Sequence, residues 1–403
     1  MKPVYKILII AGVVIIAGGA VYLAWQKLTA PVAAPATESG VGLPAGTTGT
    51  TGGVLPGSTT SETSGGSNLP IQVKTAAATL KKISESPAFD LWVAEGTGEA
   101  YYLTPDGKVM SAKDGPDLEI STETLAALNS VVAAPDGSRV LAAFGDPRAP
   151  QWAYFDIIDR TWHTLPPGIQ TAAWAGRNDQ LVALIRNGGE TNLSLITLSQ
   201  ASPATKMVLR DVGLEDISMW FQDPEQLIIA EHPSAYGASR VWRLDLKTLS
   251  FNAVLAPERG LVVKPVNLGS TGAVLQWSAA NRLFLLNRNF EHGVELLFPT
   301  FPDKCGAKGN TLYCFIPRVP LPQNIPLPDG YYQNKFYTVD SLVRTIITSS
   351  STLAFDVPDS PWASTADAPV DAKNPAYADG SVYFINRYDG YVYKLTLGTA
   401  GGN

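Results

Sequence analysis

The stretch Val131-Val132-Ala133-Ala134-Pro135-Asp136-Gly137-Ser138-Arg139-Val140-Leu141-Ala142-Ala143-Phe144 contains two short apolar runs separated by a turn sequence. Apolar runs of this length that are bounded by Pro, Asp and Gly are typical of β-strands. Asp and Gly tolerate the backbone angles of a tight turn, so the stretch predicts a β-hairpin.

Similar hairpins return about every forty residues along the chain, a spacing that indicates a repeat architecture. The paired runs are 171–174 with 181–185, 217–220 with 227–230, 262–266 with 273–277, Cys305 with 312–316, and 376–378 with 382–385. A third strand follows most of them, as at 152–157, 193–198 and 241–246. Almost no stretch has a helical period, so the predicted class is all-β.

Four-stranded units of about 40 to 50 residues are the pattern of a β-propeller. With an early unit around Phe89–Ile120, the sequence predicts seven four-stranded blades, and six or eight remain open. The last unit, which ends near Leu397, lacks a fourth strand. We expect Leu80–Ile83 to supply it and to close the ring with a strand from the opposite end of the domain.

An uncharged apolar run, Ile7–Trp25, precedes the propeller. As a helix it would span roughly 28 Å, close to the hydrocarbon thickness of a bilayer. Lys2 and Lys6 precede the run and only Lys27 closely follows it, so the positive-inside rule places the amino terminus in the cytoplasm. The favoured interpretation is an uncleaved membrane anchor, and a cleaved signal peptide or a buried helix are the alternatives.

The predicted division of the chain follows from composition. Residues 27–70 are rich in Thr, Gly, Ser and Pro and hold too few apolar groups to offset the entropy of ordering, so they are expected to form a disordered linker. The expected segments are a cytoplasmic terminus at 1–6, a transmembrane helix at 7–26, the linker, a propeller at 71–398 and a flexible tail at 399–403. This predicts a single-pass protein of a bacterial cell membrane, with an extracytoplasmic propeller.

Two Pro-Asp-Gly turns, at 105–107 and 135–137, resemble the repeat of TolB-type, WD-repeat-like propellers, which carry that turn between their two inner strands. The order of anchor, stalk and propeller, with the segments 80–87 and 303–314, is similar to membrane-anchored propellers of candidate-phylum bacteria. These resemblances imply an envelope location and partner binding in the periplasm, without a specific activity. The segment Tyr388–Tyr393 also resembles the repeat of quinoprotein-type propellers.

The chain has two cysteines, Cys305 and Cys314, on successive strands of one expected hairpin. Outside the cytoplasm they are expected to form a disulfide. Two free core thiols and redox chemistry are the alternatives. Two cysteines without a nearby histidine are a poor metal site.

No catalytic, metal or cofactor site is predicted. The three histidines, His163, His232 and His292, fall in different blades and are expected to be solvated or to pack at an edge. No zinc-protease or hydrolase motif is present. Turn chemistry accounts for the Asp residues that precede glycines, which are Asp106, Asp136, Asp379 and Asp389. The net charge of −6 argues against nucleic acid as a partner.

The segment Pro317–Tyr332 interrupts a blade where other blades have a short turn. Long loops on rigid scaffolds often carry binding, and proline and tyrosine suit contact surfaces. The alternative interpretation is a stiff insert packed over the adjacent blade. The second insertion, Asp356–Asn374, includes Trp362. The candidate interface residues are Pro317, Arg318, Pro320, Pro322, Pro326, Pro328, Tyr331, Tyr332 and Trp362. Trp174, Trp220 and Trp277 are expected in the core.

The favoured function is a non-enzymatic scaffold, tethered to the membrane, that binds a protein, peptide or glycan of the cell envelope. The alternatives are an enzyme or cofactor-dependent sensor that uses the central funnel, and a mainly structural surface protein. A scaffold predicts an aromatic or Pro-rich rim, whereas an enzyme predicts titratable side chains that converge at one mouth of the ring.

Overall fold

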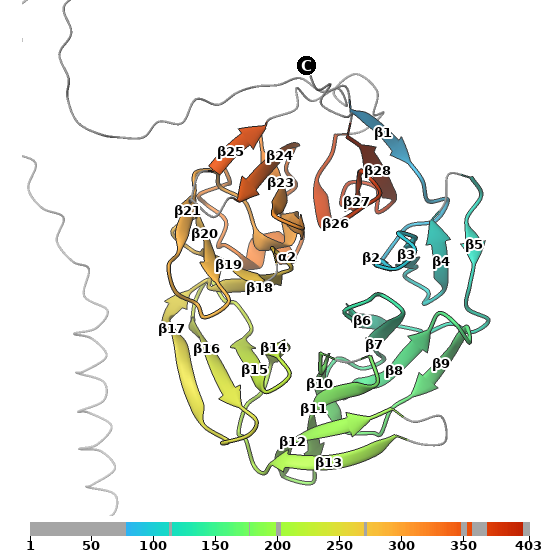
Figure 1. Ribbon diagram of the computed structural model, residues 1–403, viewed down its shortest axis with the longest axis vertical. Coiled ribbons are helices and arrows are strands. Elements are labelled where there is room, and N and C mark those ends of the chain that lie inside the picture. The colour runs from blue at the N-terminus through green and yellow to red at the C-terminus, as the bar shows by residue number, and fades with distance from the viewer. Residues whose placement is uncertain are drawn as a thin grey trace, which may run out of the picture. The chain divides into compact units, whose positions relative to one another are not determined.

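The computed structural model describes residues 78–397, except 113–114, 177, 199–202, 270–271, 348–352 and 357–368. These residues form a ring of seven four-stranded antiparallel sheets, or blades (Figure 1). Blade 1 is β2 (Asp90–Val93), β3 (Ala100–Leu103), β4 (Val109–Ala112) and β5 (Leu118–Glu119); blade 2 is β6 (Leu128–Ala133), β7 (Arg139–Phe144), β8 (Gln151–Asp156) and β9 (Thr161–Thr164); blade 3 is β10 (Ile169–Trp174), β11 (Gln180–Asn187), β12 (Glu190–Thr197) and β13 (Ala204–Leu209).

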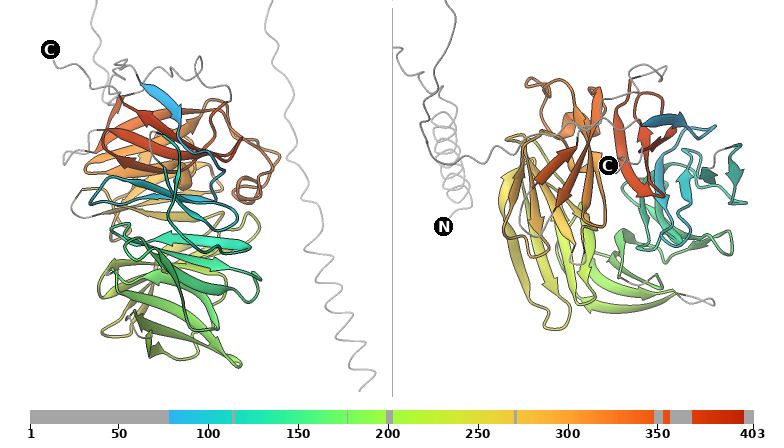
Figure 2. Two further views of the ribbon diagram at one scale, coloured as in Figure 1. Left: turned by 90° about the vertical axis from the view of Figure 1, so that its right-hand side faces the viewer. Right: turned by 45° about the horizontal axis from the view of Figure 1, so that its top comes forward.

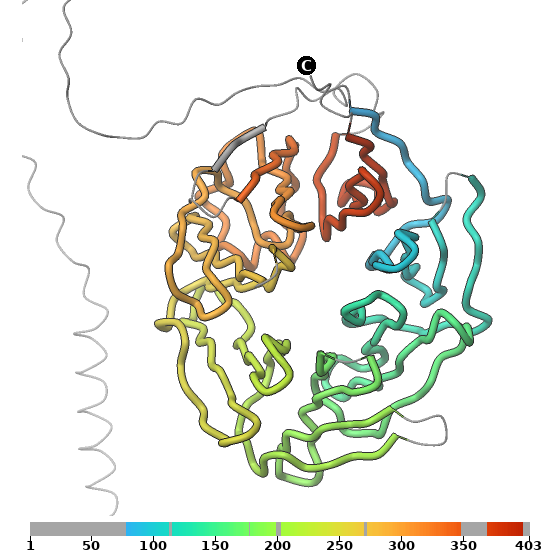
Figure 3. The backbone as a smooth tube through the Cα atoms, in the orientation of Figure 1, coloured from blue at the N-terminus to red at the C-terminus, as the bar shows by residue number. Residues whose placement is uncertain are grey.

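The remaining blades follow in chain order around the ring (Figure 3). Blade 4 is β14 (Ile217–Asp223), β15 (Gln226–Glu231), β16 (Ala238–Asp245) and β17 (Phe251–Arg259); blade 5 is β18 (Val262–Val266), β19 (Ala273–Ser278), β20 (Arg282–Asn287) and β21 (Val294–Leu296); blade 6 is β22 (Cys305–Lys308), β23 (Thr311–Pro317), β24 (Asp340–Ile347) and β25 (Leu353–Asp356); blade 7 is β26 (Ala372–Ala378), β27 (Ser381–Asn386), β28 (Val392–Thr396) and β1 (Thr79–Lys82). Two short helices, η1 (Pro302–Lys304) and α2 (Asp329–Tyr332), lie in connections. The predicted all-β class and the seven blades are confirmed.

The first described strand completes the last blade, as expected. β1 pairs with β28 in antiparallel register, with Leu80 opposite Leu395 (Figure 1, blue beside dark red). Leu80 also packs against the apolar cluster between blades 6 and 7. The ring is therefore closed by hydrogen bonds between the two ends of the domain, which removes a free sheet edge.

The hydrophobic core of the described ring is divided into seven clusters, each of which lies between two neighbouring blades. Trp174 and Trp277 are buried in it, and Trp220 is half-buried against the cluster between blades 4 and 5. The Trp174 indole also donates to the carbonyl of Val132 in blade 2 at 2.8 Å. These tryptophans hold blades together, as the repeated strand positions predict.

The opening hairpin of the sequence is β6 and β7, joined on one face of the ring by the Pro135–Gly137 turn. Gly137 has a φ of +70°, and a Cβ there would lie 2.5 Å from the carbonyl oxygen of Val93 in blade 1, so only glycine fits. The turn at Pro105–Gly107 is different. It joins β3 to β4, the second and third strands of blade 1, and the expectation that both turns join inner strands is wrong.

The two cysteines are directly opposite each other on β22 and β23 and form a disulfide. Both side chains are buried in the cluster between blades 5 and 6. The predicted disulfide is confirmed.

The ring has two distinct faces, seen edge-on in Figure 2. We call one of them the upper face; it carries the connections between the second and third strands of each blade and the connections between blades. The opposite face, called the lower face, carries the other turns. Thr79 and Thr396 pair at the lower face, where the amide of Leu397 donates to the carbonyl of Gly380 in a lower-face turn. The described chain therefore both enters and leaves the ring at its lower face.

Within the described residues, no helix has the length and apolar character to cross a bilayer. The apolar run at 7–25, the linker and the expected tail at 399–403 lie outside them.

Candidate functional site

A long insertion, residues 318–339, lies on the upper face between β23 and β24 of blade 6. The equivalent connection in blade 3 is only Gly188–Gly189. Leu321 and Tyr331 of the insertion are buried in the cluster between blades 5 and 6. The insertion also reaches blade 4, because the Asp329 carboxylate accepts a hydrogen bond from the amide of Ala235 at 3.2 Å. It therefore packs over part of the upper face.

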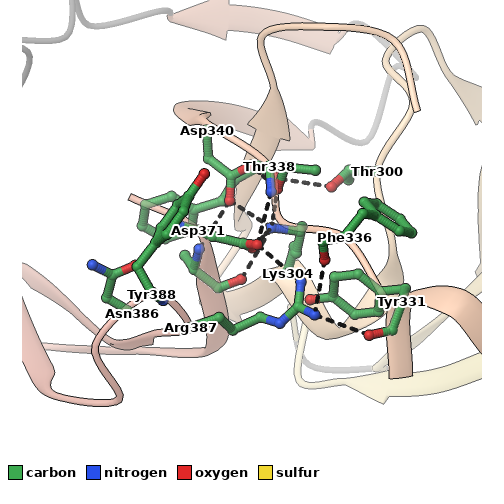
Figure 4. A network of polar contacts seen from close by, with 12 residues as sticks. Thr300, Lys304, Tyr331, Phe336, Thr338, Asp340, Asp371, Asn386, Arg387 and Tyr388 are labelled. Carbon is green, nitrogen blue, oxygen red and sulfur yellow. Dashed lines mark hydrogen bonds and ion pairs between the residues drawn. The ribbon is translucent and has the colours of Figure 1, made fainter. Parts of the chain in front are cut away.

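A buried ionic cluster, here called the Lys304 cluster, fixes the base of the insertion (Figure 4). Its members are Lys304, Thr338, Asp340, Asp371 and Arg387. The Lys304 ammonium lies 2.6 Å from Asp340 Oδ2 and 2.5 Å from Asp371 Oδ1, and it donates to Thr338 Oγ1 at 3.0 Å. The side chains of Lys304, Asp340 and Asp371 have no exposed area. Buried charges of this kind require partners, and here each has them.

Arg387 links the cluster to the insertion. Its guanidinium lies 2.9 Å from Asp371 Oδ2 and donates to the carbonyl of Tyr331 at 2.9 Å and to Asn334 Oδ1 at 2.8 Å. It also lies over the Tyr331 ring, 4.1 Å from the centroid. The two cations balance the two carboxylates, so blade 6, blade 7 and the insertion share one neutral buried network.

Beside this network, Tyr337 and Tyr388 are exposed, and we call this pair the tyrosine patch. They expose 46% and 40% of their surface. The rings of Tyr337 and Tyr388 stack at 5.2 Å, and the Arg387 guanidinium lies 5.1 Å from the Tyr337 ring centroid. The patch is therefore an aromatic surface held on a rigid base.

The predicted interface residues divide between surface and interior. Arg318, Pro320, Pro326 and Tyr332 are exposed, Pro322 is partly buried, and Pro317, Pro328 and Tyr331 are buried. Trp362 lies outside the described residues. Tyr331 stacks on Phe301 at 4.2 Å, which agrees with the interpretation of the insertion as packed over its neighbours. The exposed members are the ones that a partner can reach.

The sequence patterns did not mark the Lys304 cluster, Tyr337 or Tyr388 as parts of a functional site. The charged members of the cluster come from four separate segments of the chain, and no local pattern joins them. The aromatic content of Phe336-Tyr337 and Tyr388 was the one available signal for the patch.

A second feature of the upper face is a groove across blades 2, 3 and 4, with a volume of about 640 Å³. Its lining includes the apolar residues Val132, Leu184 and Met219 and the polar residues Arg148, Gln170 and Asp216. This volume lies within the range of pockets that bind small ligands, about 300 to 1,000 Å³.

A third feature is a cavity of about 600 Å³ along the central channel, lined by first strands of blades 1, 2, 5, 6 and 7. Asp90 lines it and accepts a hydrogen bond from the Asn374 side chain at 2.7 Å. Burial raises the pKa of the Asp90 carboxyl, although nearby Lys373 lowers it. Burial also lowers the pKa of Lys264 in the same wall, whose ammonium donates to the Cys305 carbonyl.

The histidines do not converge. His163 lies on the outermost strand of blade 2, half-exposed, stacked on Tyr154 and bonded to Asp159. His232 lines the groove, and His292 is in the connection between β20 and β21 of blade 5. Among the residues that the structure describes, no group of three or more His, Cys, Asp or Glu side chains is placed to hold a metal ion.

No protein-family model matches the chain, and no curated protein matches it in sequence. Solved propellers resemble it in fold. The β-propeller domain of Cps50 (Swd1) from Myceliophteria thermophila has a TM-score of 0.49 at 8% identity, over 79% of this chain and 100% of that one. The tricorn protease has a TM-score of 0.47 at 9% identity, over 81% and 34% of the two chains, and a prolyl endopeptidase has 0.47 at 13%, over 82% and 48%. The chain thus spans about a third of the length of the tricorn protease and about half of the length of the prolyl endopeptidase. The comparisons assign no family and give the TolB-type resemblance no support.

Proposed function

We propose that the protein is a membrane-tethered, extracytoplasmic scaffold that binds a protein, peptide or glycan of the cell envelope through its upper face. The observation that carries this proposal is the Lys304 cluster, which fixes the insertion while the tyrosine patch stays exposed. Rigid exposed aromatic side chains lose little entropy on binding and contribute large contact areas. They are therefore well suited to a binding surface.

The position of the chain ends supports the same proposal. The described chain enters and leaves the ring at its lower face, whereas the insertion and the tyrosine patch lie on the upper face. The described ends of the chain therefore leave the patch uncovered.

Photocrosslinking in the native envelope tests the proposal. A photoreactive side chain at Val339, which is 38% exposed beside the patch, is expected to capture one defined partner. Tyr337→Ser combined with Tyr388→Ser should reduce capture by about tenfold, since aromatic contacts often dominate binding energy. Ile158→Ser, at an 86% exposed position on the lower face, is the matched control and should leave capture unchanged. Equal capture by all three forms would refute a role for the patch.

The alternative function, an enzyme or cofactor-dependent sensor, has one specific observation in its favour. Asp90 and Lys264 line the same channel with pKa values shifted towards each other, a pattern that also marks functional sites. A small molecule that stabilises the full-length protein against heat, and fails to stabilise Asp90→Asn, would favour this alternative. Deletion of residues 318–339 without loss of any partner would instead favour a mainly structural role.

A further inference from the structure

The groove across blades 2–4 contains two matching irregularities. The first strands of blades 2 and 3, β6 and β10, each have a β-bulge near the upper face, where the register shifts around Asn129 and Gln170. Both residues line the groove and both carry carboxamide groups. Bulges re-aim side chains and are frequent beside binding sites. Each carboxamide nitrogen donates to a nearby glycine carbonyl, and the described residues provide no partner for either carboxamide oxygen.

Charged side chains line the groove along its length. Arg186, above blade 3, forms an ion pair with Glu215. Arg148, in blade 2, has an exposed side chain and no anionic partner among the described residues; nearby Asp146 accepts from the Arg148 backbone amide instead. At the blade 4 end, the Asp216 side chain is 83% exposed, and its one ion-pair partner among the described residues is His232, at 3.9 Å. The groove thus has a free guanidinium at one end and a weakly paired carboxylate at the other.

Between these ends the lining includes the apolar side chains of Val132, Leu184, Met219 and Trp152, together with small polar residues. Val132 exposes 37% of its surface. The groove therefore combines apolar lining residues, two carboxamides at equivalent positions and opposite charges at its ends. A carboxamide offers both a donor and an acceptor, as a peptide group does.

We propose that this groove binds an extended peptide segment, with a carboxylate at Arg148 and a cationic group at Asp216. The carboxamides of Asn129 and Gln170 would hydrogen-bond to the peptide backbone, and an apolar side chain would lie on Val132 and Met219. A guanidinium pairs with a carboxylate through two parallel hydrogen bonds, which fixes the direction of the segment. The site is separate from the tyrosine patch, and it extends the proposed function, in which a peptide is one of the partners.

The probe is a library of short randomised peptides, prepared with free and with blocked ends and, in a second set, with and without acidic side chains. The immobilised full-length protein is exposed to each set, and retained peptides are quantified by mass spectrometry. Retention is expected to favour peptides that carry both a carboxylate and a cation. The two sets show whether the carboxylate comes from the peptide terminus or from an acidic side chain.

Variants assign the contacts. Arg148→Gln should lower retention of carboxylate peptides by about tenfold, the loss of affinity expected when one hydrogen bond to a charged group is removed. It should also remove the preference for peptides with a free carboxylate over peptides with blocked ends. Asp216→Asn should remove the preference for cations. Asn129→Ala with Gln170→Ala should weaken retention of every class. Arg160→Gln, an exposed arginine in a lower-face turn, is the matched control and should change nothing.

Retention that does not depend on charge, or that is equal in Arg148→Gln and Arg160→Gln, would overturn the proposal. So would retention of oligosaccharides in place of peptides. Tyr337→Ser with Tyr388→Ser should leave peptide retention intact. The groove proposal and the proposed role of the tyrosine patch can therefore be refuted independently of each other.

Discussion

The ammonium group of Lys304 lies 2.6 Å from the Asp340 carboxylate, and neither side chain has any exposed surface. Lys304 belongs to η1, just before blade 6, and Asp340 begins β24 at the end of the insertion. Their contact, together with Asp371, connects the insertion to the interior of two blades. Loss of one partner leaves an unpaired charge in a region that water does not reach.

Replacing Lys304 with Met should lower the free energy of unfolding by about 3 to 5 kcal/mol, the usual cost of breaking a buried pair. Urea denaturation of the full-length protein measures it. Lys308→Met is the control, because Lys308 and Glu95 are half-exposed and 3.7 Å apart, and it should cost less than about 1 kcal/mol. Adding Asp340→Leu to Lys304→Met should restore much of the loss. Equal urea midpoints for the two single variants would contradict the importance of the cluster.

Removal of residues 1–77 should leave a stable ring, whereas removal of residues 1–83 should not. The longer deletion takes away β1, leaves blade 7 with three strands, and uncovers β28 and Leu395. An exposed strand edge and exposed apolar surface favour association. Size-exclusion chromatography and urea denaturation of the two truncated forms distinguish the outcomes. A monomeric, equally stable shorter form would show that strand closure is dispensable.

The Cys305–Cys314 disulfide should be present in protein isolated from its native envelope. Intact mass before and after reduction and alkylation gives the number of free thiols. Replacing both cysteines with alanine should lower the free energy of unfolding by about 2 to 3 kcal/mol from lost loop constraint, with a further loss from the buried sulfur atoms. Two alkylated thiols in unreduced protein would point to a reducing compartment instead.

The stability contribution of Asp90 should fall as pH rises. Burial raises its pKa in the folded state, so from the ordinary aspartate pKa of about 3.9 up to the raised value the folded state binds more protons than the unfolded state. The free energy of unfolding of the wild type, minus that of Asp90→Asn, should therefore decrease over this interval and then level off. Urea denaturation at several pH values measures the difference. A difference that grows with pH would mean that Lys373 and Asn374 outweigh burial.

The proposed topology is open to a direct labelling test. The two cysteines of the sequence are joined, so a single new cysteine is the only reactive thiol. Tyr236→Cys, at a position that is 74% exposed, should react with a membrane-impermeant maleimide in spheroplasts. Lys2→Cys, in the expected cytoplasmic terminus, should react only after the cells are permeabilised. The reverse pattern would place the propeller in the cytoplasm.

Local patterns were sufficient for most of the strands. The closing strand near Leu80 was predictable because the last unit of the sequence lacks a fourth strand and this segment could supply it. The hairpins and the cysteine pair were predictable because each depends on apolar alternation and turn residues within one short segment. The Pro-Asp-Gly turn at 105–107 was misplaced for the same reason. The tripeptide specifies a tight turn, but it does not specify which two strands of a blade the turn joins.

The sequence by itself determined the class, the repeat and the order of the strands, because these follow from patterns between neighbouring residues. Only the tertiary structure decided which distant residues meet. Lys304, Asp340, Asp371 and Arg387 form one network because ring closure brings connections from blades 6 and 7 together. The groove likewise exists because blades 2, 3 and 4 stand side by side, and it aligns the bulges at Asn129 and Gln170. Such long-range contacts depend on the geometry of packed blades, which no single segment of the sequence encodes.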